Sequence, residues 1–309
     1  MIGVIGEALV DLVIAPDGSV VAHLGGGPYN TARAAGRLGA DVSFYGTLSR
    51  DRFGRALADQ LTVDGVDVSH AMRVEQPSTL AAAELDDDGA ATYRFYTAGT
   101  SAQLFDADAV DLTAVDIIFT GGLALVLQPV ADEVERLVTS LGDGVALMVD
   151  VNCRPRIVDD REGYRRSVEQ VLSRAHVIKV STDDLRYFYP DLEPRQAART
   201  LAQGGTGVVL LTDGGADVTI LTAAGERSVP VPEIEVVDTV GAGDAFCGGF
   251  MASAQARGST LNSGALSLDQ LADVVRDAVG VSAIACQRAG ADPPTASEVP
   301  GWIGTDQRN

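Results

Sequence analysis

Short aliphatic runs alternate with amphipathic stretches along most of the 309-residue chain. The runs are rich in Val and Ile without polar alternation, as is typical of strands buried on both faces. Such alternation predicts βαβ units, which build a mostly parallel sheet covered by helices. The predicted strands are Ile2–Ile5, Val42–Gly46, Ile117–Thr120, Val145–Val149, Val177–Val180 and Val208–Leu211. The predicted helices are Asn30–Leu38, Arg52–Val63, Pro129–Leu141, Gly163–Ser173, Arg195–Gln203, Gly243–Arg257 and Leu268–Cys286.

Two regions break this rhythm, around Pro16-Asp17-Gly18-Ser19 and around Asp86-Asp87-Asp88-Gly89. Asp-Gly turns between aliphatic runs predict β-hairpins. We expect the hairpins, about residues 9–24 and 79–97, to form a small separate sheet. It would cover the carboxyl edge of the main sheet, where open α/β folds bind ligands. Since no Pro- or Ser-rich linker interrupts the chain, we expect one α/β domain over residues 1–309 with this lid inserted.

The charge balance excludes some partners. The sequence has 43 acidic and 23 basic side chains, a formal net charge of −20, and both nucleic acids and anionic membranes need a basic surface. No run of about 18 apolar residues and no basic, apolar leader is present, so neither a membrane span nor a signal peptide is expected. The three cysteines and three histidines are scattered, which argues against a disulfide framework or zinc site. We expect a cytoplasmic protein.

Lys179 is the only lysine in the sequence. A Walker A loop needs a lysine directly after its glycines, and a protein kinase needs one on its third strand. Lys179 lies in His-Val-Ile-Lys-Val-Ser, with no glycine loop before it. A chain like this could therefore bind ATP only by holding the phosphates in another way.

The segment Asp238–Phe246 reads Asp-Thr-Val-Gly-Ala-Gly-Asp-Ala-Phe, and it follows the apolar extended stretch Ile234–Val237. Gly241 and Gly243 would leave backbone N–H groups uncovered at a helix N-terminus, which binds anions without any lysine. Asp244 in the first turn could accept the proton of a hydroxyl that attacks a phosphoryl group. The residues alone fit equally well an ordinary glycine-rich helix start with an acidic cap.

A second glycine-rich segment, Gly25–Gly39, reads Gly-Gly-Gly-Pro-Tyr-Asn-Thr-Ala-Arg-Ala-Ala-Gly-Arg-Leu-Gly. Its three leading glycines allow the backbone to approach a ligand closely. Asn30 would begin a helix and offers both a donor and an acceptor. A plain connection from hairpin to helix, with Asn30 as N-cap, explains the same residues.

Together these segments resemble the two motifs of the ribokinase (PfkB) family of carbohydrate kinases: Gly25–Gly39 the N-terminal motif and Asp238–Phe246 the C-terminal one. Three intermediate landmarks match in order: Gly6–Asp11, Asp150–Pro155 and Thr212–Gly214. The resemblance extends from Ile2 to about Pro294. It implies the α/β ribokinase-like three-layer fold, with a central mostly parallel sheet and a small β-sheet lid.

The resemblance implies transfer of the γ-phosphoryl group of ATP to a sugar hydroxyl. The catalytic base would be Asp244, and the anion hole would be formed by the amides of Gly241, Ala242, Gly243 and Asp244. The sugar hydroxyls would be bound by Asp11, Gly26, Gly27 and Asn30. Tyr96 on the lid would close over the sugar, and Arg154 would face either the sugar or the phosphates.

The resemblance also implies nucleotide and metal contacts. Thr212 and Gly214 would line the phosphates of ATP, and residues near Ala285 would flank the base. The family commonly has Asn-x-x-Glu after the lysine, and its acid helps to order Mg²⁺. Here Ser181 replaces the Asn and Asp184 replaces the Glu on a shorter arm, which favours metal contact through water. Asp183 and Asp184 also fit a helix N-terminal acid pair.

In some family members the aspartate that opens the C-terminal motif helps bind a monovalent cation, which implies a K⁺ site at Asp238. The lid sheet would have exposed edges, and pairing two lids would cover them. We therefore expect a homodimer through the lid. The expected partners are the sugar and ATP, with no nucleic acid and no membrane.

The start of the chain, Gly6-Glu7-Ala8-Leu9-Val10-Asp11, resembles that of fructokinases, so fructose is the implied sugar. Ribokinases usually have Lys where this chain has Gly27. Fructokinases and 2-keto-3-deoxygluconate kinases often have Arg where it has Thr97, and the missing Arg argues against an acidic sugar, whose carboxylate needs a guanidinium partner. The alternative is a kinase of the same family for 2-keto-3-deoxygluconate, another sugar or polyol, or a nucleoside.

Two other classes fit less well. A nicotinamide dehydrogenase should have G-x-G-x-x-G after the first strand, which Gly3–Ala8 does not provide. A non-catalytic sugar or nucleotide sensor would be favoured by a missing base, but Asp244 is present.

Overall fold

The computed structural model describes residues 1–86, 91–204, 207–262 and 266–303. Its main sheet has eight strands in the order β14-β13-β12-β11-β10-β9-β1-β4. The strands from β12 to β4 run parallel, and β13 and β14 extend the sheet antiparallel. The bounds are β1 Ile2–Ile5, β4 Val42–Phe44, β9 Ile117–Gly121, β10 Ala146–Asp150, β11 Val177–Ser181, β12 Val208–Thr212, β13 Val218–Thr222 and β14 Gly225–Val229.

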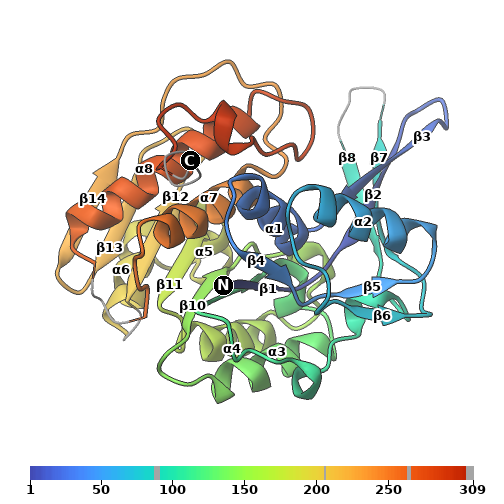
Figure 1. The fold of residues 1–309 in the computed structure, drawn as a ribbon, viewed down its shortest axis with the longest axis horizontal. Helices are drawn as coiled ribbons and strands as arrows, with labels where there is room; N and C mark the ends of the chain where they lie inside the picture. Colours follow the sequence, from blue (N-terminus) through green and yellow to red (C-terminus); the bar gives the residue numbers. More distant parts are fainter. Residues whose placement is uncertain (87–90, 205–206, 263–265, 304–309) are drawn as a thin grey trace.

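Helices cover both faces of the sheet, giving three layers (Figure 1). One face packs against α1 Gly27–Arg37, α2 Arg52–Val63, α7 Ala242–Ala256 and α8 Leu268–Ala285. The other packs against α3 Val130–Ser140, α4 Arg161–Leu172, α5 Thr182–Phe188 and α6 Pro194–Gln203. Alternate strand residues serve the two cores, as Met148 points to the first and Leu147 to the second. This confirms the predicted mostly parallel three-layer α/β fold.

A second sheet of four strands has the order β3-β2-β7-β8 and projects beside the main sheet (Figure 1). Its strands are β2 Leu9–Ile14, β3 Val20–Gly25, β7 Thr79–Leu85 and β8 Ala91–Tyr96. The two hairpins pair through β2 and β7, in parallel, so they form one small sheet as predicted. Gly18 has φ +82° in the first hairpin turn. The second turn, predicted at 86–89, lies mostly outside the described residues.

All the predicted strands and helices are present, with ends mostly within two residues of the prediction. Helix α1 begins three residues earlier than predicted, because Pro28 fits its first turn. Three features were not predicted: α5, the antiparallel pair β13 and β14, and the two-stranded sheet of β5 Thr47–Ser49 and β6 Met72–Val74. The stretch Ile234–Val237 is not a strand, and Val236 and Val237 are exposed.

The sheet order reverses at β1, which lies between β4 and β9. Open α/β sheets bind ligands outside the carboxyl ends of their strands at such a switch point. The chain leaves β1 after Ile5 and β9 after Gly121, so the segments that follow both strands begin at this edge of the sheet. Among the described residues, no helix has the length and apolar composition needed to cross a membrane.

Candidate active site

The N-terminus of α7 is shaped by Gly241, its N-cap, which has φ +76°. This left-handed conformation favours glycine, and a Cβ there would lie 2.7 Å from the Cβ of Ala291. The turn directs the first amides of α7 toward the carboxyl edge, where they have no intrahelical acceptor. One of the four predicted anion-hole donors is engaged, since the Ala242 N–H donates to the Thr239 carbonyl oxygen (3.2 Å).

Asp244 is the third residue of α7 and is buried. Its Oδ2 accepts a 2.9 Å hydrogen bond from Nδ2 of Asn30. Burial raises the pKa of the Asp244 carboxyl to about 6, while the Asn30 hydrogen bond opposes that rise. A carboxyl with this pKa is mostly ionised at neutral pH and is still basic enough to accept a proton.

Helix α1 brings the first glycine motif against α7. Gly26, its N-cap, has φ +116°, and a Cβ there would lie 2.8 Å from the Glu7 carbonyl oxygen. A Cβ on Gly27 would lie 3.5 Å from Asp244 Oδ1, so the backbone passes directly beside the carboxylate. The Oδ1 of Asn30 is buried and has no partner among the described residues. It is therefore available to accept a hydrogen bond from a ligand hydroxyl.

The side chain of Asn152 also lies close to Gly27. Among the described residues, Asn152 is the one non-glycine residue that has a positive φ (+36°). Its Nδ2 lies 3.3 Å from where a Cβ on Gly27 would be. Unusual backbone conformations of this kind cluster at functional sites. Asn152 was not predicted as a site residue, because the sequence does not reveal that an asparagine has a positive φ.

Three carboxyls lie around the glycine loop Gly25–Gly27: those of Asp244 and Glu7 are buried, and that of Asp11 on β2 is half-buried. Burial raises the pKa of Asp11 to about 6 and that of Glu7 to about 7. The positive charge of Arg154 opposes the rise at all three. Of the residues predicted to bind the sugar, Asn30 and Gly27 lie beside Asp244, Gly26 lies beside Glu7, and Asp11 lies beside Gly25 at the start of the same glycine motif.

Glu7 was not predicted as a site residue. Its Oε1 accepts a hydrogen bond from the Gly27 N–H (3.2 Å) and would lie 2.9 Å from a Cβ on Gly122. Its Oε2 is buried and has no partner among the described residues. The carboxyl thus joins the end of β1 to the glycine loop and to the turn after β9. An acid directly after an apolar strand is the signal that could have identified it.

The residues predicted to bind the nucleotide follow neighbouring strands. Ser181 and Thr212 are register partners at the carboxyl ends of β11 and β12. Ser181 is the N-cap of α5, and Gly214, two residues past β12, has φ +53°. Ala285 is buried at the end of α8, and the next carbonyl, that of Cys286, accepts from the Val237 N–H. These residues thus lie at the ends of three elements.

The predicted metal ligands have protein partners. Asp184 accepts hydrogen bonds from the Cys153 N–H (2.8 Å), the Ser181 N–H (2.9 Å) and the Ser181 hydroxyl (2.7 Å). With Ser181 it forms a capping box at the start of α5. Asp238 accepts from the N–H groups of Val240 (3.0 Å) and Gly290 (2.8 Å). Within the described ranges no group of three His, Cys, Asp or Glu residues could hold a metal.

The chain is similar to a known protein family and to several known proteins. The model of the pfkB family of carbohydrate kinases matches residues 1–298. The chain belongs to the pfkB family of carbohydrate kinases. It is similar to a fructokinase of Rhizobium leguminosarum bv. trifolii, 30% identical over 86% of this chain and 83% of that protein. It is also similar to an aminoimidazole riboside kinase of Salmonella typhimurium, 28% identical over 80% and 79% of the two chains.

Among solved structures, the fructokinase of Xylella fastidiosa with bound ATP superimposes with a TM-score of 0.88. It is 27% identical, and the match covers 98% of this chain and 97% of that one. Family membership, the ribokinase-like fold and the assignment as a sugar kinase are therefore confirmed. The roles of individual residues stay predictions.

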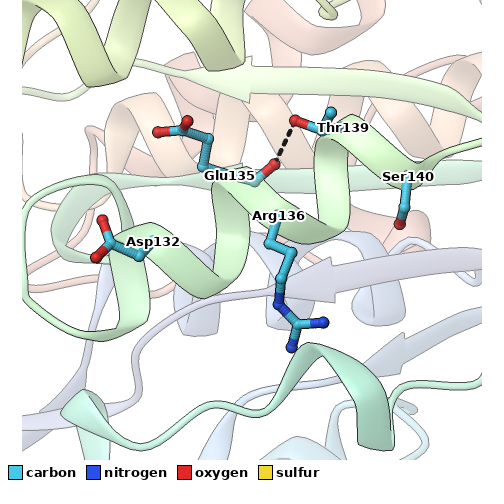
Figure 2. Close-up of a pocket in the computed structure, with 5 residues that line it drawn as sticks. All are labelled: Asp132, Glu135, Arg136, Thr139 and Ser140. Atoms are coloured by element: carbon cyan, nitrogen blue, oxygen red, sulfur yellow. Dashed lines mark hydrogen bonds between the residues drawn. The ribbon is translucent and has the colours of Figure 1, made fainter.

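A surface depression on the kinase lies elsewhere (Figure 2). All its lining side chains come from α3: Asp132, Glu135, Arg136, Thr139 and Ser140. Helix α3 packs on the face of the sheet opposite to α1 and α7 (Figure 1). Arg136 is paired with Asp108 and Glu133. The depression is thus separate from the glycine motifs and offers no free cation to an anionic ligand at Arg136.

Proposed function

We propose that this kinase transfers the γ-phosphoryl group of ATP to a hydroxyl of fructose. The observation that carries the proposal is the buried Asp244, held by Asn30 at the amide-rich start of α7. The two motifs of the family thus meet at one carboxylate. The names of the similar fructokinases support fructose as the sugar.

In the proposed reaction, a sugar hydroxyl oxygen attacks the γ-phosphorus of ATP. The new P–O bond forms as the bond from the γ-phosphorus to the β,γ-bridging oxygen breaks, and ADP leaves with that oxygen. The hydroxyl proton passes to Asp244. The amides of Gly243 and Asp244 stabilise the charge on the transferred group, as oriented donors do in phosphoryl transfer. Asp11 and Asn30 orient the hydroxyls, and Arg154 adds positive charge.

Mg²⁺ is proposed to arrive with the nucleotide. The oxygens of Asp184 already accept three hydrogen bonds from protein donors, which is a poor arrangement for a direct ligand. Mg²⁺ typically keeps several waters and binds through substrate phosphates. We propose that Asp184 faces the metal only through water, and that Thr212, Gly214, Ser181 and Ala285 contact the nucleotide. A K⁺ site at Asp238 stays part of the proposal.

The lid is proposed to close over the sugar with Tyr96, whose side chain is exposed on β8. Exposed apolar side chains on this sheet include Val20 (55%), Val21 (54%) and Tyr93 (43%). Pairing of two lids would cover such residues and the sheet edges, which supports a homodimer. Sedimentation velocity tests it, and a monomer at micromolar concentration would argue against it. The three free cysteines suit the reducing cytoplasm, where we place the enzyme.

The decisive experiment measures ADP release with MgATP and a panel of fructose, 2-keto-3-deoxygluconate, ribose and a nucleoside, with and without K⁺. Fructose should give the highest kcat/KM. Asp244→Asn should keep the fold and lower kcat by at least 10³-fold. Asp273→Asn, which removes a half-exposed acid on α8, is the matched control and should retain activity. Turnover of a nucleoside but not of fructose would support the alternative substrate, which the similar riboside kinase makes worth testing.

A further inference from the structure

Lys179 and Asp150 form a buried ion pair beneath the first turn of α7. They are register partners on the parallel strands β10, where Asp150 is the last residue, and β11, where Lys179 is the third of five residues. Their side chains therefore leave the sheet on the same face. Lys179 Nζ lies 3.0 and 3.1 Å from the two oxygens of Asp150. The residues are only 7% and 2% exposed. Buried pairs often stabilise a fold no better than apolar residues of the same volume, so this one needs another explanation.

Gly243 is where the pair meets the helix. A Cβ on this glycine would lie 3.0 Å from Lys179 Nζ and 4.0 Å from Asp150 Oδ2. Gly243 is the second residue of α7, where the backbone conformation can be adopted by any residue and does not require glycine. Its missing side chain is explained by the ammonium directly beneath it. The lysine therefore touches the turn whose amides face the transferred phosphoryl group.

The ammonium keeps its charge there. Burial opposes the charge, but the Asp150 carboxylate outweighs it and raises the pKa of Lys179 above its ordinary value. All the other side chains that make up the 23 lysines and arginines of the sequence are arginines. A compact ammonium fits beside Gly243, whereas a planar guanidinium needs more room. The positive charge also adds to the positive end of the α7 dipole.

We propose that Lys179, held by Asp150, is a positioning residue for phosphoryl transfer. The inference rests on the function proposed above. Asp150 fixes the ammonium beneath Gly243, and the positive charge holds the first turn of α7 in place when the anionic phosphoryl group reaches its amides. Asp244, the next residue, thereby keeps its orientation toward Asn30. In this role Lys179 touches neither the sugar nor the proton that is transferred.

The test variant is Lys179→Met combined with Asp150→Asn, which removes both charges and leaves no unpaired carboxylate. With fructose and MgATP we expect kcat to fall at least tenfold. The KM for fructose should stay within twofold, and the melting temperature should not fall. A kcat within twofold of wild type would overturn the proposal, and so would a loss confined to the KM for fructose.

The matched control removes an ion pair at the other end of α7. Arg257 and Asp277 are 2.7 Å apart, and Arg257→Met with Asp277→Asn should leave kcat within twofold. A loss of kcat as large as that of the test variant would overturn the proposal, because any weakening of α7 would then suffice. If the test variant does not fold, Gly243→Ala displaces the ammonium while keeping both charges. It should also lower kcat at least tenfold, and wild-type kcat would overturn the proposal.

Asp244→Asn is assayed in the same series to separate the two proposals. Wild-type turnover by Asp244→Asn would reject the proposed function and, with it, the role of Lys179. An inactive Asp244→Asn together with a fully active double variant would reject the role of Lys179 alone.

Discussion

Asn30 donates a 2.9 Å hydrogen bond to Oδ2 of Asp244 and so joins residues 214 positions apart in the sequence. The bond connects the start of α1 to the first turn of α7, helices that pack against each other. It fixes one carboxylate oxygen, while Oδ1 faces Gly27. The carboxylate therefore has one oxygen for orientation and one on the side of the glycine loop.

The kcat/KM of the wild-type enzyme for fructose should fall at acidic pH. The pKa of Asp244 is raised to about 6, mainly by burial, and only the ionised form can accept the hydroxyl proton. We expect kcat/KM for fructose to drop about tenfold per pH unit below this value and to level off above pH 7. A profile from pH 4.5 to 8.5 at saturating MgATP measures it. A flat profile down to pH 5 would contradict a base with this pKa.

Removal of the Asn30 amide should shift the acidic limb of this pH profile, the range in which kcat/KM falls with decreasing pH. The hydrogen bond favours the ionised form of Asp244, so Asn30→Ala should raise the pKa of the base. We expect the limb to shift upward by about one pH unit, with a raised KM for fructose. The same pH profile provides the measurement. Thr62→Ala on α2, a helical residue whose hydroxyl bonds only within its helix, is the control and should leave the limb unchanged.

Glu7 should make the stability of the ligand-free protein depend on pH. Its pKa is about 7 in the fold against 4.5 as a free group. The folded state thus holds a proton that the unfolded state has released between these values. The contribution of Glu7 to the free energy of unfolding is therefore fully present below pH 4.5, and it is lost as the pH rises toward 7. Asp11 and Asp244, raised to about 6, act in the same direction.

Glu7→Gln should remove part of that dependence. A neutral amide can still accept from the Gly27 N–H, so the variant should be more stable than wild type at pH 8 by about 1–3 kcal/mol. At pH 4.5 the two should differ little. Urea unfolding at both pH values tests this without any activity assay. Equal stability of the two proteins at pH 8 would show that Glu7 is not a costly buried charge.

Gly241→Ala should harm both stability and turnover. An alanine at φ +76° is strained, and its Cβ would press on Ala291 at 2.7 Å. We expect a loss of about 2–4 kcal/mol in the free energy of unfolding and at least a tenfold lower kcat. Gly258→Ala is the matched control, since Gly258 has φ +60° but a Cβ there would meet nothing within 4 Å. It should cost about 1–2 kcal/mol and leave kcat unchanged.

The sequence predicted most of the architecture because its signals are local. Val- and Ile-rich runs marked the parallel strands, and Asp-Gly marked the hairpins. Helix α5 was missed because its seven residues are too few for a clear helical period. Strand β14 was missed because its first four residues, Gly225–Ser228, are exposed and interrupt the aliphatic pattern. The loop after Val231 looked extended only because it is rich in Val and Ile.

Within the candidate site, the motifs predicted the residues that now lie together, such as Asn30 and Asp244. They could not indicate contacts set by the sheet register. Asp150 and Lys179 are 29 residues apart, and only the pairing of β10 with β11 makes them neighbours. No sequence motif connects Glu7 with another residue. Its place in the candidate site is seen only in the structure, where Gly27 and Gly122 lie beside its carboxyl.

The position of β1 affects how the enzyme forms during synthesis. Strand β1 is synthesised long before its neighbour β9, which begins only at Ile117, and Asp244 follows far later still. A nascent chain thus holds β1 and the glycines Gly25–Gly27 long before it holds Asp244. Because no fragment that ends before α7 contains Asp244, the arrangement around this buried carboxyl can form only after α7 has been synthesised.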